Sequence, residues 1–173
     1  IAGTNRPIKV IEVSLPKSYQ YTVESPLPED ADYDLAQKIH TAPEAAARIR
    51  RMLDLVGGHT STLIFVNSRQ NAEMLGHKFN QLTSDIAVHH GSLSKEERSL
   101  IEDQFKAKNL KAIVCTSTLE LGIDIGHVDL VIQYLSPRQV SSLIQRVGRS
   151  GHKLNLISKG IIVTAFSDDT LEA

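Results

Sequence analysis

At 173 residues the chain fits one domain with a substantial core, and its apolar content of 41% without Trp suits an aliphatic interior. A formal net charge of −1 excludes the global basic field that drives sequence-independent DNA binding, so any nucleic-acid contact has to be local. The single cysteine, Cys115, lies in an apolar run, and no apolar stretch approaches ~18 residues. We therefore expect a cytoplasmic protein with neither a disulfide framework nor a membrane partner.

Residues 1–40 are the least periodic part of the chain. An apolar run predicts a strand over Ile8–Val13, and a proline-containing stretch without a helical or strand pattern follows it. We expect an initial strand and an irregular excursion, both belonging to the same domain as residues 41–173.

Strands and helices alternate from residue 41 onward. Continuous apolar runs predict buried strands, while capping residues or proline predict the helix starts between them. The expected strands are Thr62–Val66, Ile86–His89, Ala112–Cys115, Val128–Tyr134 and Gly160–Thr164. The expected helices begin near Thr41, Asn67 or Ser68, Ser94 and Ser136, and the first of them ends at Gly57.

Apolar spacings of three and four residues mark the faces that the later helices should bury. These faces are Ala72, Leu75, Phe79 and Leu82, then Leu100, Ile101 and Phe105, then Val140, Leu143, Ile144 and Val147. The alternation predicts right-handed crossovers and an α/β fold, an open parallel sheet with helices on both faces in three layers, α/β/α. Ligands of such sheets bind beyond the carboxyl ends of the strands.

Four polar strings lie where strands or helices should end, and the first is Asn67-Ser68-Arg69. Exposed backbone amides and the helix dipole make such a corner a phosphate site, with Asn67 and Ser68 as added donors. A routine helix cap explains this string equally well.

The second string is His89-His90-Gly91-Ser92, again at a strand end. Adjacent side chains on a strand point to opposite faces, so the two histidines are not expected to share a metal ion, and no metal site is predicted. A turn at Gly91 with the hydroxyl of Ser92 nearby would suit a nucleic-acid backbone.

In the third string, a strand delivers Thr116 and Thr118, and a glycine, Gly122, precedes a carboxylate, Asp124. The hydroxyls can donate to phosphate, Gly122 allows close approach of a nucleotide, and Asp124 can accept from a ribose hydroxyl or orient an arginine. Alternatively, the hydroxyls are capping groups and Asp124 is a loop carboxylate.

The fourth string runs from Gln145 to His152 and places Arg146 and Arg149 at a helix end broken by glycine. Guanidinium groups are permanently cationic and forked, so they can hold the oxygens of a phosphoryl group during its transfer. A solvated basic helix end is the alternative.

In this order the strings resemble motifs IV, IVa, V and VI of superfamily 2 helicases, in the second of their two RecA-like motor domains. The resemblance spans residues 45–164 and is closest to the large helicase-related (Lhr) group of archaeal and bacterial DNA helicases. It implies a RecA-like sheet in the helicase C-terminal domain, as a piece of a larger helicase with a role in DNA repair.

The resemblance also implies roles for the strings. Arg149 is similar to an arginine finger for ATP held on the first motor domain, with Gln145 and Arg146 supporting the same interface. Gly122, Asp124 and His152 would lie near the nucleotide. Many superfamily 2 members have a third arginine where this chain has His152, and because a neutral imidazole does not replace a fixed cation, the finger role should rest on Arg149. The implied contacts to a nucleic-acid strand are Asn67, Ser68, Arg69, Gly91, Ser92, Thr116 and Thr118.

Two absences complete the prediction. The chain contains neither a G-x-x-x-x-G-K-[ST] loop nor an Asp-Glu pair after an apolar strand. The cofactor, ATP with Mg²⁺, is therefore expected to be held mainly by the first RecA-like domain of the same polypeptide, and this chain alone should not hydrolyse it. The expected partner is single-stranded nucleic acid, DNA in preference to RNA. The alternatives are a non-catalytic adaptor module with this fold and an RNA helicase domain.

Overall fold

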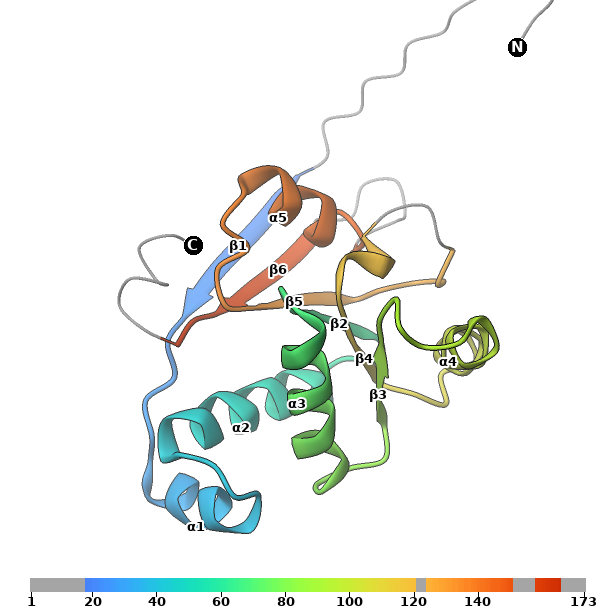
Figure 1. Cartoon of the computed structure of the whole chain (residues 1–173). Coiled ribbons are helices and arrows are strands. Elements are labelled where there is room, and N and C mark those ends of the chain that lie inside the picture. The colour runs from blue at the N-terminus through green and yellow to red at the C-terminus, as the bar shows by residue number, and fades with distance from the viewer. Residues whose placement is uncertain (1–17, 121–123, 151–157, 166–173) are drawn as a thin grey trace, which may run out of the picture.

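One parallel β-sheet organises the protein (Figure 1). The computed structural model describes residues 18–120, 124–150 and 158–165, and within them six strands pair in the order β1-β6-β5-β2-β4-β3. The pairs are all parallel, so the carboxyl ends of these strands meet at one edge. The strands are β1 (Tyr19–Glu24), β2 (Thr62–Phe65), β3 (Ile86–His89), β4 (Ala112–Cys115), β5 (Leu130–Tyr134) and β6 (Ser158–Val163).

Helices cover both faces of the sheet, which confirms the predicted three-layer α/β/α fold. The helices are α1 (Asp30–Lys38), α2 (Pro43–Gly57), α3 (Arg69–Asn80), α4 (Lys95–Lys106) and α5 (Val140–Val147), with a short 3₁₀ helix, η1 (Ser117–Leu119), after β4. Alternate residues of a strand face opposite ways, so Ile64 of β2 packs with α2 and α3, whereas Leu63 and Phe65 pack with α4 and α5.

The region expected to be an irregular excursion is more regular than predicted, because it contains β1 and α1. Strand β1 pairs with β6 along its whole length, but its side chains are mostly exposed, so no buried apolar run marks it in the sequence. Helix α1 begins with a capping box formed by Glu29 and Asp32. The expected strand Ile8–Val13 lies outside the described residues.

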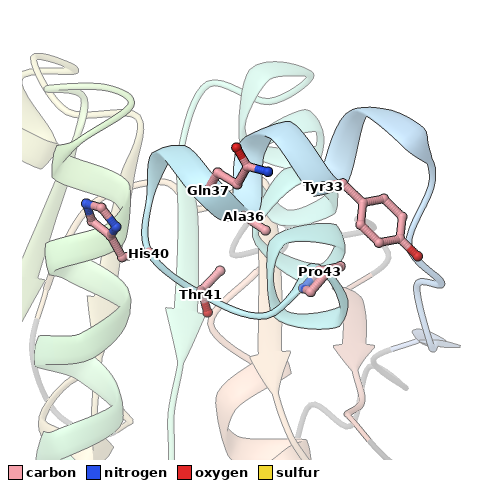
Figure 2. Close-up of a pocket in the computed structure, with 6 residues that line it drawn as sticks. All are labelled: Tyr33, Ala36, Gln37, His40, Thr41 and Pro43. Carbon is pink, nitrogen blue, oxygen red and sulfur yellow. The ribbon is translucent and has the colours of Figure 1, made fainter.

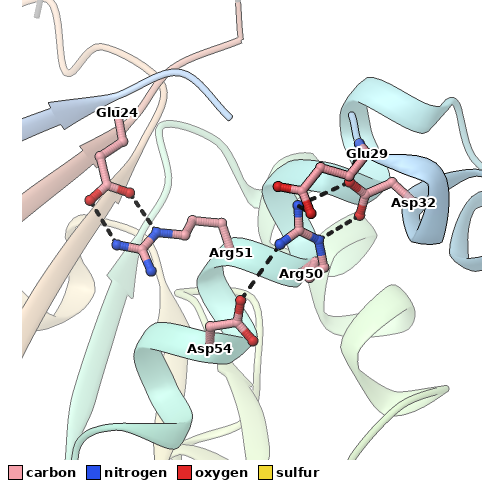
Figure 3. A network of polar contacts seen from close by, with 6 residues as sticks. All are labelled: Glu24, Glu29, Asp32, Arg50, Arg51 and Asp54. Atoms are coloured by element: carbon pink, nitrogen blue, oxygen red, sulfur yellow. Dashed lines mark hydrogen bonds and ion pairs between the residues drawn. The ribbon is translucent and has the colours of Figure 1, made fainter. Parts of the chain in front are cut away.

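Two consecutive arginines of α2 hold this N-terminal region against the sheet (Figure 3). Arg50 contacts the buried carboxylate of Asp32 through Nε at 2.7 Å and Nη2 at 3.0 Å. Arg51 makes the same forked contact with Glu24, at 2.7 and 2.9 Å. Because Glu24 ends β1 and Asp32 lies in α1, α2 fixes both elements through charge-assisted hydrogen bonds.

Helix α5 begins at Val140, not at Ser136 as predicted. Arg138 has a φ of 60°, a left-handed conformation that interrupts a helix, and its main-chain nitrogen donates to the hydroxyl of Ser136 at 3.1 Å. The predicted buried face is therefore half wrong. Leu143 and Val147 are buried, but Val140 is 74% exposed and Ile144 is 42% exposed.

The other differences concern single residues. Leu100 of α4 is exposed, because the sheet contacts Ile101 and Phe105 instead. Strand β5 begins two residues later than predicted and β6 two residues earlier. Ser68 and Ser94 cap α3 and α4 as expected, each hydroxyl accepting from a main-chain nitrogen of the first turn. The cap of α2 is Ala42, so Thr41 does not cap it.

A glycine allows α5 to approach β6. A Cβ atom built on Gly160 would lie 2.9 Å from Cγ1 of Val147 and still nearer to its Cγ2. Any larger side chain at this position would push α5 away from the sheet. The position of the fourth polar string, which begins within α5, therefore depends on Gly160.

Candidate functional site

The first three polar strings lie on one continuous stretch of the carboxyl edge. They follow β2, β3 and β4, and β4 pairs with both of the other strands. Residues that are 50 apart in the chain therefore share this edge, as the predicted parallel sheet requires.

The string after β2 combines a helix N-terminus with an exposed arginine. Ser68 caps α3, accepting from the main-chain nitrogen of Asn71 at 3.1 Å. Arg69 is exposed, and its Nη1 donates to the hydroxyl of Ser92 at 3.1 Å. Together with Gln70 and Glu73, Ser68 and Arg69 line a pocket of about 640 Å³. Both the capping and the phosphate-site interpretations are compatible with this geometry.

The two histidines at the end of β3, His89 within the strand and His90 directly after it, point to opposite faces of the sheet, as predicted. His90 contacts Glu73 of α3 through Nε2 at 2.7 Å, and its Nδ1 accepts from the main-chain nitrogen of Ser92 at 3.3 Å. His89 contacts Glu102 of α4 through Nε2 at 3.0 Å. Among the described residues, no group of three or more His, Cys, Asp and Glu side chains is placed to hold a metal ion.

In the string after β4, the two threonines contact other protein groups, whereas Asp124 is exposed. Thr116 is half-buried, and its main-chain nitrogen approaches the carbonyl of His89 at 3.4 Å. Thr118, also half-buried, contacts Nδ1 of His89 through its hydroxyl at 2.9 Å. Asp124 is exposed and accepts from the main-chain nitrogen of Gly126 at 3.1 Å, the contact of a loop carboxylate. Gly122 lies outside the described residues.

Arg146 is the centre of a buried polar cluster. It is 7% exposed, and its guanidinium lies 5.5 Å from the ring centre of Phe65. Its Nη1 donates to Gln133 at 2.7 Å and to Asn67 at 3.2 Å, while its Nε meets the Glu120 carboxylate at 3.3 Å. One cation thus connects the ends of β2 and β5 with the segment after η1. Arg146 was expected to support the nucleotide interface together with Gln145, and its guanidinium contacts protein groups.

Arg149 contacts the same segment after η1 in a more exposed position. It follows Gly148, which caps α5, and its Nε donates to the main-chain oxygen of Glu120 at 2.9 Å. The side chain is half-buried, in contrast to that of Arg146. Gln145 is exposed, and His152 lies outside the described residues. The structure therefore brings Arg149 next to the third string, as the motif interpretation requires.

Sequence reasoning missed the partners of these arginines. Gln133 is fully buried, and its Nε2 donates to the carbonyls of Tyr134 and Leu135 at 3.1 and 2.9 Å. A glutamine inside a buried apolar strand has to find polar partners, and this was the available signal. Glu120 gave no comparable signal, because a glutamate near a strand end is usually solvated.

Two further features lie apart from this site. A pocket of about 520 Å³ is formed beside α1 and α2 (Figure 2), and none of the predicted site residues lines it. Its lining consists of Tyr33, Ala36, Gln37, His40, Thr41 and Pro43. Within the part of the chain that the structure describes, no helix combines the length and apolar character needed to cross a membrane.

The fold and the order of the site elements define a RecA-like α/β domain of the helicase class. A solved DEAD-box protein from Methanococcus jannaschii shares the fold, with a TM-score of 0.66 at 20% identity over 90% of this chain and 38% of that chain. A model of the helicase conserved C-terminal domain family matches residues 44–153, and the chain belongs to this family.

Relatives with higher identity confirm the expected resemblance to the Lhr group. The ATP-dependent helicase Lhr-Core protein 2 of Thermococcus barophilus is 38% identical over 98% of this chain and 20% of that protein. The helicase Lhr of Mycobacterium smegmatis, solved with single-stranded DNA and AMP-PNP, has a TM-score of 0.78 at 35% identity over 95% of this chain and 22% of that chain. The chain thus spans about a fifth of the length of these relatives.

Proposed function

We propose that this chain is the second motor domain of an ATP-dependent, Lhr-like helicase that acts on single-stranded DNA. The observation that carries the proposal is the position of Arg149, which is hydrogen-bonded to the segment that leaves the carboxyl edge after β4. The same edge presents the hydroxyls and amides after β2, β3 and β4. The segment after β4 therefore joins a cation for a nucleotide with donors for a strand.

On the nucleotide side, Arg149 fits the phosphate end of ATP that is held by another domain. Bound ATP supplies the phosphoryl bond whose hydrolysis releases free energy. Arg149 stabilises the charge that develops on the phosphate oxygens, because a guanidinium forks to two oxygens and stays charged. Arg146 acts as a positioning residue, because its buried contacts to Glu120 and Gln133 hold the last turn of α5, which leads to Arg149, in place. The Mg²⁺ that accompanies ATP would be held mainly by the first motor domain.

On the strand side, Thr116, Ser92 and the N-terminus of α3 present hydrogen-bond donors to a phosphate backbone. Contacts of this kind hold a strand without reading its sequence, which suits an enzyme that moves along nucleic acid. The formal net charge of −1 is compatible with this function, because binding would rely on these local donors rather than on a global field.

The test uses the full-length protein that contains this chain. We expect ATP hydrolysis that single-stranded DNA stimulates, and no hydrolysis by the 173-residue chain alone. Thr116→Ala should weaken the stimulation by DNA and leave basal hydrolysis unchanged, whereas the exposed neighbour Ser117 provides a matched control as Ser117→Ala. Equal loss of basal and stimulated hydrolysis in Thr116→Ala would contradict the strand contact.

Two other functions remain testable alternatives. An adaptor module would bind nucleic acid without any ATPase activity in the full-length protein. An RNA helicase would be stimulated more strongly by RNA than by DNA of the same sequence. This comparison is needed because the backbone donors described here do not distinguish the two sugars.

A further inference from the structure

His89 is a buried histidine that connects helix α4 with Thr118 of the third polar string. It ends β3, it is 0% exposed, and it lies on the α4 face of the sheet, opposite Cys115 of β4. Its Nε2 contacts Glu102 of α4 at 3.0 Å, and its Nδ1 contacts the hydroxyl of Thr118 at 2.9 Å. The imidazole is the bridge between α4 and the proposed strand contact at Thr118.

The chemistry of the two partners fixes the hydrogen positions when the ring is neutral. A carboxylate only accepts hydrogen bonds, so Nε2 of His89 carries the proton and donates it to Glu102. Nδ1 then has a lone pair and accepts, which means that the Thr118 hydroxyl donates to it. In this state the single hydrogen of the Thr118 hydroxyl points inward.

This arrangement conflicts with binding of phosphate by Thr118. Phosphate oxygens also only accept, so the hydroxyl has to turn its hydrogen away from His89 to bind one. The Nδ1 lone pair would then be buried without a partner, at a cost of about 1–3 kcal/mol. If Nδ1 takes up a proton instead, it donates to the Thr118 oxygen. Every donor and acceptor from Glu102 through His89 and Thr118 to the phosphate then has a hydrogen-bond partner.

We propose that His89 is a positioning residue that links phosphate binding by Thr118 to the uptake of one proton from solvent. The inference rests on the proposed function, because it takes the nucleic-acid strand as the source of the phosphate. No covalent bond changes other than the new N–H bond at Nδ1 of His89. The imidazolium is balanced by the Glu102 carboxylate on one side and by the bound phosphate beyond Thr118 on the other.

The charges around His89 determine the direction of the pH dependence. Burial lowers the pKa of His89, the hydrogen bond and charge of Glu102 oppose this shift, and Arg98 of α4 adds to it, so that the net pKa lies below its ordinary value. Burial also raises the pKa of the Cys115 thiol on β4, which therefore stays neutral. The ring is neutral at pH 7 without a ligand.

Bound phosphate favours the protonated ring, so the affinity for a strand should increase as the pH falls below neutral. One linked proton changes the affinity by at most about tenfold per pH unit. The increase should level off below the pKa of the free protein, where His89 is already charged.

The experiment measures binding of oligothymidylate to the full-length protein between about pH 5.5 and pH 8, together with calorimetric proton uptake in buffers of different ionisation enthalpy. His89→Gln retains an amide donor for Glu102 but does not titrate, and Thr118→Val keeps the shape of Thr118 without its hydroxyl. We expect both variants to take up about one proton fewer than the wild type on binding. Thr118→Ser restores the hydroxyl and should restore the uptake.

The control is His127→Gln, which removes a half-exposed histidine before β5, at the opposite edge of the sheet. It should leave the uptake unchanged. Binding with the same proton uptake in wild type, His89→Gln and Thr118→Val would overturn the inference and leave the proposed function intact. Absence of oligothymidylate binding at every pH would overturn the proposed function and this inference with it.

Discussion

Nε of Arg149 donates a hydrogen bond to the main-chain oxygen of Glu120 at 2.9 Å. The carboxylate of the same Glu120 meets the buried Arg146 at 3.3 Å. One residue after η1 therefore holds both arginines of the fourth string, one through its backbone and one through its side chain. The two arginines can consequently be tested apart, because a change of the Glu120 side chain affects Arg146 but retains the main-chain oxygen for Arg149.

Arg149→Ala in the full-length protein should lower kcat for ATP hydrolysis by about 10³-fold or more, with nucleotide affinity largely retained. The reason is that a finger acts on charge that develops only in the transition state. Steady-state hydrolysis and equilibrium binding of a nucleotide analogue measure the two quantities. Lys106→Ala removes an exposed cation of α4 as a control, and unchanged turnover in Arg149→Ala would exclude the finger role.

Arg146→Ala should destabilise the chain by about 3 kcal/mol or more, because it leaves the largely buried Glu120 and Gln133 without their partner. Urea unfolding provides the measurement. The adjacent Gln145 is exposed, so Gln145→Ala should change the free energy of unfolding by less than about 0.5 kcal/mol. A loss in Arg146→Ala as small as that expected for Gln145→Ala would show that the cluster around Arg146 does not stabilise the fold.

Gly160→Ala should reduce stability by about 1–3 kcal/mol, because the new methyl group would overlap Val147 and displace α5. The ATPase activity of the full-length protein should fall as well, since α5 leads to Arg149. Gly57→Ala is the matched control: a Cβ there meets nothing within 4 Å, and alanine in this helix should add up to about 1 kcal/mol. Thermal unfolding distinguishes the two signs, and a stabilised Gly160→Ala would refute the packing argument.

Asp32 should make the stability of the chain depend on pH in the acid range. The hydrogen bonds from Arg50 lower the pKa of Asp32, and burial only partly opposes them. A carboxyl group with a lowered pKa stabilises the fold fully above its ordinary value, about 3.9, and this contribution is lost as the pH falls through the lowered pKa. Asp32→Asn should therefore reduce stability at pH 7 and flatten the decline below about pH 4.

The exposed Asp30, in the same helix turn, serves as the control for this prediction. Asp30→Asn should leave both the stability at pH 7 and the acid dependence close to those of the wild type. Unfolding curves recorded across the acid range provide the comparison. An unchanged acid profile in Asp32→Asn would mean that another carboxylate dominates the decline.

Most of the sheet could be predicted because its strands are buried on both faces. Such strands are continuous apolar runs, and Ile86–His89 and Ala112–Cys115 match β3 and β4 to the residue. The edge strand β1 could not be found in this way, since Tyr19, Tyr21 and Val23 are 38–42% exposed and the strand is defined by pairing with a distant segment. The contact between Asp32 of α1 and Arg50 of α2 joins residues 18 apart, so the sequence gives no local sign of it.

The candidate site was predictable in its location but less so in its contacts. A parallel sheet places every strand end at one edge, so the positions of Asn67, His89 and Thr116 at one edge could be predicted. The contact of Arg149 with Glu120 could not, because Arg149 follows a helix. Which arginine is buried depended on tertiary structure. The two guanidinium groups are chemically equivalent in the sequence, and only the positions of Gln133 and Glu120 show that Arg146 is the buried one.

Strand β6 lies between β1 and β5, and the hydroxyl of Thr164 reaches the carbonyl of Glu24 across 140 positions of the sequence. During synthesis β1 therefore leaves the ribosome long before β6, the strand with which it pairs. Until β6 is made, the edge of β5 has no strand to pair with. The salt bridge between Glu24 and Arg51 is available much earlier and can hold β1 near its final place. The strand order therefore predicts that insertion of β6 between β1 and β5 is slow. Until it is complete, the unpaired strands can pair with those of another molecule.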